Sequence, residues 1–247
     1  MENKIISEEI EKALKNIFEV TKPVSIFIYG SRARTDFKST SDYEVGALYP
    51  RENKPKRSDI SKLHNVEGMN VYPFVMEDLE KYNLDTPFPK AIYLRELISS
   101  SQTILGQEIL KKMELPEIRL TDLLERASFD LATAFAAYRS FKSNDLITSS
   151  VNFKSILFGT RVLEILELKK FPFTYDEILE LSKELNLLPK YRELIEHAGK
   201  VRKGEKVEEQ FIFSGITYLN QEVLAKIKHQ ISETGDRVIL EGKKIDW

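Results

Sequence analysis

Two carboxylates and a glycine–serine pair lie close together near the start of the sequence. Asp42 and Glu44 are two residues apart in a stretch that alternates as a β-strand does, and ten residues separate Ser31 from Asp42. Alternate side chains of a strand point to the same face, so the two carboxylates would lie side by side. Mg²⁺ prefers such hard oxygen ligands when it also carries phosphate oxygens. The spacing therefore predicts a site for magnesium and phosphate.

The residues before the carboxylates suit phosphate binding. Gly30 would let the backbone approach a phosphate closely, and Ser31 offers a backbone N–H and a hydroxyl. Arg34 adds a planar set of donors that matches phosphate oxygens. Arg32 is interpreted as a surface residue.

The elements that must position these residues predict a small α/β unit. We expect a helix capped by Ser7, strands over 24–29, 42–49 and 69–75, and helices over 88–98 and 106–113. The strand over 24–29 is a run of β-branched and aromatic residues interrupted only by Ser25, and it stops at Gly30. Pro73 cannot donate to a ladder, so the strand over 69–75 is expected at a sheet edge or with a bulge.

Helical periodicity dominates from residue 120 onward. An apolar stripe runs from Leu124 to Phe141, a second helix is expected over 151–168, and Thr174 with Glu177 forms a capping box that opens a third. The predicted inner face of that third helix is Ile178, Leu181, Leu185 and Leu188. Two further helices are expected near 190–200 and 214–233. The predicted class is α+β, with a small mixed-sheet domain over 1–116 and an all-α helical bundle over 117–247.

Composition excludes several classes of function. The 247 residues contain no cysteine, which removes thiol catalysis and Cys-ligated zinc or iron–sulfur sites. Thirty-seven basic residues against 39 acidic ones leave no basic arm for nucleic acid or for a membrane surface. The charged N-terminal segment does not resemble a signal peptide, so a soluble, cytoplasmic protein is expected. His64, His197 and His229 share no metal-ligand spacing and are interpreted as surface residues.

The stretch from Ile28 to Val45 carries the signature of a known family. Its Tyr-Gly-Ser turn, the arginine four residues after the glycine and the Ser-Asp-x-Glu strand resemble the DNA polymerase β-like nucleotidyltransferase superfamily. Within it, the sequence is most similar to the kanamycin nucleotidyltransferase type of aminoglycoside nucleotidyltransferase. The segments 70–79 and 235–247 are also similar in form to that type.

The resemblance implies an activity and a set of roles. Asp42 and Glu44 would hold Mg²⁺ on a nucleoside triphosphate, most readily ATP, and Ser31 and Arg34 would bind its β- and γ-phosphates. An acceptor hydroxyl would attack the α-phosphorus, so that AMP is transferred and pyrophosphate leaves. The implied acceptor is a small, aminoglycoside-like molecule, and the implied assembly is a homodimer.

Two positions depart from the family's pattern. Asn70 stands where most members have a third carboxylate, and an amide neither binds Mg²⁺ as strongly nor accepts a proton. Glu67 could replace it only if the strand register slipped. The family's general base comes from the first helix of the helical half, where Asp130 is the nearby acid. Asp130 follows Arg126 by four residues, the spacing of an ordinary helical ion pair, so the proton acceptor is left open.

Two other functions remain open on the sequence. One is a protein-modifying (AMPylating) nucleotidyltransferase, against which the fused helical half argues. The other is a nucleotide-binding relative with lost or weakened catalysis, an alternative that Asn70 suggests because it stands in place of a carboxylate. The basic residues Lys54, Lys56 and Arg57 are interpreted as a solvated loop rather than as part of a substrate site.

Overall fold

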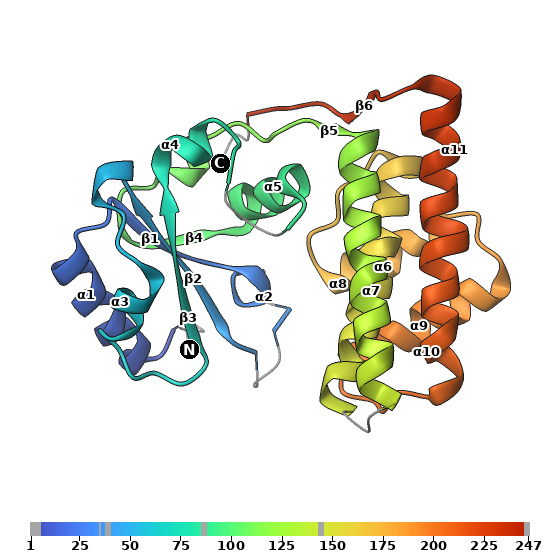
Figure 1. The fold of residues 1–247 in the computed structure, drawn as a ribbon, viewed down its shortest axis with the longest axis horizontal. Coiled ribbons are helices and arrows are strands. Elements are labelled where there is room, and N and C mark those ends of the chain that lie inside the picture. Colours follow the sequence, from blue (N-terminus) through green and yellow to red (C-terminus); the bar gives the residue numbers. More distant parts are fainter. Residues whose placement is uncertain (1–5, 35, 38–40, 85–87, 143–145, 245–247) are drawn as a thin grey trace. The chain divides into compact units, whose positions relative to one another are not determined.

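The structure is a computed structural model in which the chain forms two compact units (Figure 1). The described residues are 6–34, 36–37, 41–84, 88–142 and 146–244. One unit holds Met1–Pro116 together with the tail from Gly242, and the other holds Glu117–Glu241. The predicted α+β class is confirmed. The tail, which the sequence assigned to the helical half, groups with the first unit.

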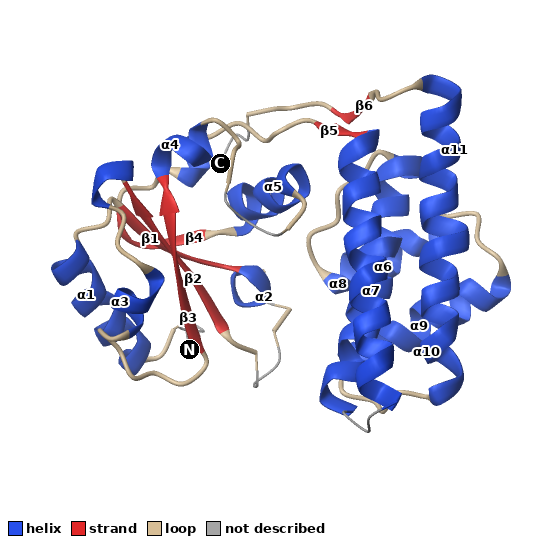
Figure 2. Cartoon of the chain, viewed as in Figure 1, coloured by secondary structure: helices blue, strands red, loops and turns tan. Residues whose placement is uncertain are grey.

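The first unit is built on a four-stranded mixed sheet (Figure 2). Its elements are α1 (Glu8–Thr21), β1 (Ser25–Tyr29), α2 (Gly30–Ala33), β2 (Tyr43–Tyr49), α3 (Arg57–Ser61), β3 (Met69–Val75), α4 (Met76–Glu80), α5 (Lys90–Ser100) and β4 (Gln102–Gly106). The strand order is β3-β2-β1-β4, with β1 antiparallel to both neighbours and β3 parallel to β2. The strand that contains Pro73 is therefore an edge strand, as predicted.

Burial on both faces of the sheet explains why four successive residues of β1, Ile26 to Tyr29, are apolar or aromatic. Ile26 and Ile28 pack on one face in a core that includes Leu14 of α1. Phe27 packs on the other face in a core that includes Leu94 of α5. Because successive strand residues alternate between faces, all five residues of β1 are buried. The helix before β1 begins where predicted, with the Ser7 hydroxyl accepting from the backbone of α1.

The helix expected over 106–113 is wrong. Residues 102–106 form β4, paired with β1, and only Leu110–Lys112 adopts a helical turn, of the 3₁₀ type. Gly106 ends the strand with φ of +83°, and a Cβ atom there would lie 2.3 Å from the Val24 carbonyl oxygen. The close approach of two backbones therefore ends β4 at a glycine, and this contact is not visible in local sequence periodicity.

The second unit is a helical bundle with a short antiparallel ladder. Its elements are β5 (Ile118–Arg119), α6 (Leu120–Lys142), α7 (Leu146–Leu163), α8 (Tyr175–Leu181), α9 (Pro189–Arg202), α10 (Glu209–Thr217), α11 (Ala225–Thr234) and β6 (Val238–Leu240). Two π-helical turns, at Glu164–Leu168 and Tyr218–Leu224, adjoin these helices.

The predicted start of α8 is confirmed, but its predicted inner face is too long. Thr174 and Glu177 form the capping box, with each side chain bonded to the other's backbone. The helix ends at Leu181, and Leu188 is 54 % exposed immediately before α9. In the part of the chain that the structure describes, no helix is both long enough and apolar enough to cross a membrane.

Candidate functional site

The residues of the predicted site meet at one end of the sheet. Tyr29 pairs with Glu44 across β1 and β2, and Glu44 pairs with Asn70 across β2 and β3. Asp42 directly precedes β2, and its carboxylate accepts from Asn70, the strand partner of Glu44, so the two carboxylates lie on the same side. The turn at Gly30 follows β1 at the same end. The structure therefore brings both carboxylates, the turn and the Asn70 amide into one row.

Gly30 is required by the position of Glu44. Its φ is +73°, a conformation that side chains rarely adopt. A Cβ atom at this position would lie only 1.9 Å from Glu44 Oε2. The carboxylate thus packs directly on the backbone of the turn that leads to Ser31. This explains why a glycine must precede Ser31 when Glu44 faces it from the next strand.

Asn70 occupies the position beside the carboxylates, and Glu67 does not. The Asn70 Nδ2 group donates to Asp42 Oδ2 at 3.3 Å. Its Oδ1 atom accepts from Arg57 Nη2 at 3.4 Å. The pairing of Asn70 with Glu44 shows that the strand register does not slip, and Glu67 is exposed three residues earlier.

Arg57 is a member of this group that the sequence placed in a solvated loop. Its guanidinium lies 4.0 Å from the centre of the Tyr72 ring while it contacts Asn70. Tyr72 is two residues beyond Asn70 on β3, so the two side chains share a face of the sheet. Arg57 is exposed, as predicted, but it begins α3 rather than lying in a loop, and its contacts place it beside the predicted site. Its contacts depend on residues at least 13 positions away, and no local pattern indicates them.

The two arginines after the turn have different surroundings. Arg32 donates twice to the Ser41 carbonyl, at 3.0 and 2.7 Å, and its guanidinium lies 3.6 Å from the Tyr43 ring centre. It thus anchors the backbone just before Asp42 and is not a free surface residue. Arg34 has a side chain that is 8 % exposed, with Nε 3.6 Å from Asp36 and Nη1 3.5 Å from Glu96. Phosphate binding by Arg34 stays a prediction and would require an exchange of carboxylate partners.

Two tyrosines adjoin the carboxylates. Burial raises the pKa of Tyr29 and the pKa of Tyr93, and the charge of Glu44 raises both further. The two hydroxyls hydrogen-bond each other, and their rings meet edge to face with centroids 6.4 Å apart. Both hydroxyls therefore stay protonated beside Glu44. Tyr93 lies on α5, far along the chain from the signature, and no local pattern in the sequence indicates it.

Asp130, the possible general base, lies in the helical unit as one half of a buried ion pair. Its two oxygens accept from Arg126 Nε and Nη2, both at 2.9 Å. The Arg126 guanidinium also lies 4.4 Å from the Phe158 ring centre. The structure therefore contains the ordinary ion pair that the spacing suggested. A role for Asp130 as base stays a prediction, because a substrate hydroxyl would have to compete with a guanidinium.

The side chains suit Mg²⁺ as a pair rather than as a closed cage. Within the described residues, no three acidic or histidine side chains gather as a metal-ligand set. Asp42 and Glu44 supply two hard oxygen donors on one face. Mg²⁺ is commonly held by one or two carboxylates, with phosphate oxygens and water completing its shell. The residues present therefore fit a magnesium ion that arrives with a triphosphate.

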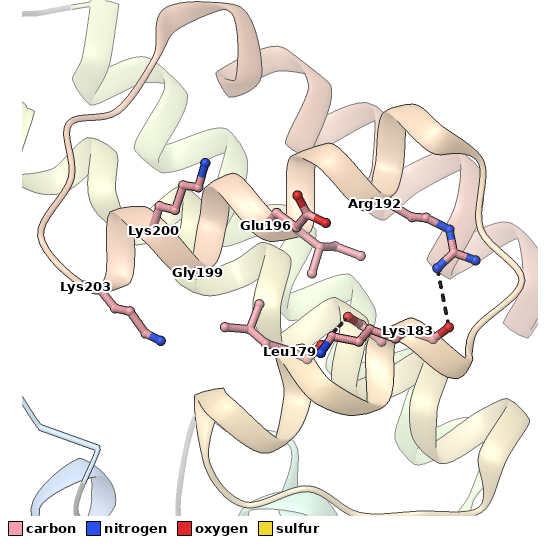
Figure 3. Close-up of a pocket in the computed structure, with 9 residues that line it drawn as sticks. Leu179, Lys183, Arg192, Glu196, Gly199, Lys200 and Lys203 are labelled. Atoms are coloured by element: carbon pink, nitrogen blue, oxygen red, sulfur yellow. Dashed lines mark hydrogen bonds between the residues drawn. The ribbon is translucent and has the colours of Figure 1, made fainter.

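A separate cavity of about 350 Å³ lies in the helical unit, between α8 and α9 (Figure 3). Leu179 lies against Gly199, where a Cβ atom would approach it to 2.7 Å, so the two helices are in close contact. Arg192 at the rim donates to the Leu185 carbonyl at 2.7 Å, and Lys203 pairs with Asp176 at 3.1 Å. None of the predicted site residues lines this cavity.

Comparisons with known proteins identify the fold. No protein-family model matches the sequence, and no curated protein matches it. The crystal structure of spectinomycin adenyltransferase AAD(9) from Enterococcus faecialis, with ATP and spectinomycin, is similar with a TM-score of 0.57 at 15 % identity, over 87 % of this chain and 98 % of that chain. A nucleotidyltransferase-like protein from Exiguobacterium sibiricum 255-15 has a TM-score of 0.35 at 13 % identity, over 91 % of this chain and 80 % of that chain. The first similarity confirms the expectation from the sequence at the level of the fold: the chain has the fold of a nucleotidyltransferase.

Proposed function

We propose that the chain is a Mg²⁺-dependent nucleotidyltransferase that moves AMP from ATP to a hydroxyl group of a small molecule. The packing of Glu44 on the Gly30 backbone, with Asp42 on the same face, carries this proposal. The adenyltransferase of similar fold, which was crystallised with ATP and spectinomycin, supports a nucleotide and a small-molecule acceptor. An aminoglycoside-like acceptor and a homodimer, both implied by the sequence resemblance, stay predictions.

Each residue of the site would have a distinct role in the transfer. Asp42 and Glu44 would hold one or two Mg²⁺ ions, which when bound neutralise triphosphate charge and polarise the phosphorus. Gly30 and Ser31 would donate backbone N–H groups, and Ser31 a hydroxyl, to phosphate oxygens. A bond would form from the acceptor oxygen to the α-phosphorus as the bond to pyrophosphate breaks. The hydroxyl proton would pass to a carboxylate, for which Asp130 is the candidate from the sequence.

Calorimetric titration of Mg²⁺-ATP tests the nucleotide site without knowledge of the acceptor. We expect binding to the wild-type protein and its loss in Asp42→Asn, because the variant removes one of two charged ligands. Asp59→Asn is the matched control: it removes an exposed carboxylate of the same unit that pairs with Lys62 instead. Circular dichroism would establish that the variants are folded.

Two results would change the proposal. Absence of Mg²⁺-ATP binding to the wild-type protein, or equal binding to Asp42→Asn, would contradict it. Binding without pyrophosphate release would favour the second candidate, a nucleotide-binding relative with lost catalysis. The observation behind that candidate is Asn70, which holds an amide beside Asp42 where a third carboxylate would otherwise lie.

A further inference from the structure

Different groups lie on the two sides of the carboxylate pair formed by Asp42 and Glu44. In the strand order β3-β2-β1, the Gly30 turn lies on the β1 side of Glu44, and Asn70 lies on the β3 side. In phosphoryl transfer the attacking and leaving oxygens are roughly in line, on opposite sides of the phosphorus. The proposed function places the β- and γ-phosphates at the Gly30 turn. An in-line attack would then bring the acceptor hydroxyl from the side away from this turn, which is the β3 side.

A positive charge is fixed on this β3 side. Arg57 is exposed, yet it is held by the Tyr72 ring at 4.0 Å and by Asn70 Oδ1 at 3.4 Å. Asn70 in turn donates to Asp42, so a single amide separates the guanidinium from the carboxylate pair. Among the described residues, no carboxylate forms an ion pair with Arg57. The stack and the amide orient this guanidinium and leave its charge available to a ligand.

Exposed charges of both signs lie near Arg57 in the sequence, and Glu52 is an acid of the same segment. Lys54 and Lys56 are exposed in the segment that leads to Arg57. Arg51, at the start of the same segment, pairs with Asp78. Glu67 is an exposed acid that precedes β3. Asp42 and Glu44 would attract a cation in the free protein, but bound Mg²⁺ would neutralise them during the reaction.

We propose that Arg57 is a specificity-determining residue that makes the site favour an anionic hydroxyl acceptor over a polycationic one. This inference rests on the proposed function, because that function defines which flank receives the acceptor. An acceptor with a phosphate or carboxylate near its hydroxyl can pair with the planar guanidinium in a bidentate manner. A polycation, such as an aminoglycoside, would meet a like charge at the same place. The acceptor class therefore differs in charge from the class that the sequence resemblance implies.

Three hexoses of equal ring size test the charge preference. Glucose 6-phosphate, glucose and glucosamine would be titrated by calorimetry into the full chain saturated with Mg²⁺ and α,β-methylene-ATP. We expect glucose 6-phosphate to bind about tenfold tighter than glucosamine, because a charge-assisted pair replaces a like-charge contact, with glucose between them. Arg57→Gln should abolish this order, and Arg57→Lys should keep part of it. Lys54→Gln, which removes a charge from the same segment without touching Asn70, should leave the order unchanged.

The outcomes separate this inference from the proposed function. Equal binding of the three hexoses, tighter binding of glucosamine, or binding of none of them overturns the role of Arg57. The same holds if Arg57→Gln keeps the wild-type order. If the wild-type protein fails to bind the magnesium–nucleotide complex, the proposed function itself fails. Nucleotide binding with no charge preference leaves that function in place and removes only the inference about Arg57.

Discussion

Glu164 is a charged residue type in surroundings that disfavour its charge. It is fully buried where a π-helical turn follows α7, and neither carboxyl oxygen has a hydrogen-bond partner among the described residues. Burial raises its pKa to about 9, although the neighbouring Arg161 acts in the opposite direction and Glu184 adds to the rise. The folded protein therefore holds this carboxyl neutral near pH 7.

Glu164 makes stability depend on pH, and Glu164→Gln should remove that dependence. The folded state keeps the proton up to about pH 9, whereas the unfolded state releases it near the ordinary value of 4.5. The folded state thus binds more protons across this window, so the unfolding free energy of the wild-type protein falls as pH rises through it. We expect the variant to be more stable than wild type at about pH 8, on the order of 1–3 kcal/mol, and to lose this advantage at about pH 5. Denaturant titrations at both pH values measure it, and an advantage independent of pH contradicts it.

Local patterns could predict the residues of the site that follow one another along the chain. Asp42, Glu44 and Gly30 follow from spacing and residue type, and Asn70 from the position of the third strand. Arg57 could not be predicted, because its partners come from β3. His197 was expected at the surface but is 5 % exposed, with its ring stacked on Phe211 at 4.5 Å. Such contacts depend on the tertiary fold and leave no local periodicity.

At the scale of elements, one residue pair between β1 and β2 leaves no room for an added side chain. Phe27 pairs with Gly46, and a Cβ atom on the glycine would lie 2.1 Å from the Phe27 ring. The ring of Phe27 lies 6.0 Å from that of Tyr29 and 5.7 Å from that of Phe74. Tyr29 pairs with Glu44, so this aromatic cluster supports the strand that carries the site.

Gly46→Ala should destabilise the first unit by about 1–3 kcal/mol, because an added methyl group overpacks a buried ring contact. Chemical denaturation followed by circular dichroism measures the change. Phe27→Leu added to Gly46→Ala should recover part of the loss, since a smaller side chain makes room for the methyl group. An unchanged denaturation midpoint for Gly46→Ala, or no recovery in the double variant, would show that the contact between residue 46 and the Phe27 ring does not affect stability.

The elements that were predicted correctly are those buried along a regular face. α1, β1 and the capped start of α8 show the expected periods and caps. β4 was missed because its first four residues are only half-buried and its strand form depends on pairing with β1. The ladder of β5 and β6 was missed because its strands have two and three residues.

At the scale of the whole molecule, each unit has its own buried interior. In the first unit, two apolar cores cover the two faces of the sheet. In the second, helices contribute buried residues such as Leu123, Ile156 and Leu219. A compact unit with its own core is expected to unfold cooperatively by itself.

Unfolding should therefore show two thermal transitions, and a ligand that binds one unit should shift only the transition of that unit. In the proposed site, Mg²⁺-ATP contacts residues of the first unit. At a ligand concentration of a hundred times Kd it should stabilise the folded form of that unit by about 2.7 kcal/mol and so raise the midpoint temperature of that transition alone. Chelation of Mg²⁺ with EDTA should abolish the rise, while Glu164→Gln should move only the other transition. Differential scanning calorimetry resolves the two. A single transition that responds to both changes would contradict separate unfolding.

Leu115 and Lys243 exchange two backbone hydrogen bonds, at 2.7 and 3.2 Å, at the points where the chain leaves the first unit and returns to it. The chain therefore leaves the first unit and returns to it at neighbouring positions. All four strands of the sheet precede Leu115, so none of their connections passes through the helical half. The chain path of the carboxylate-bearing sheet is therefore complete before the helical half begins, so changes in the length or order of the later helices would leave that path unaltered.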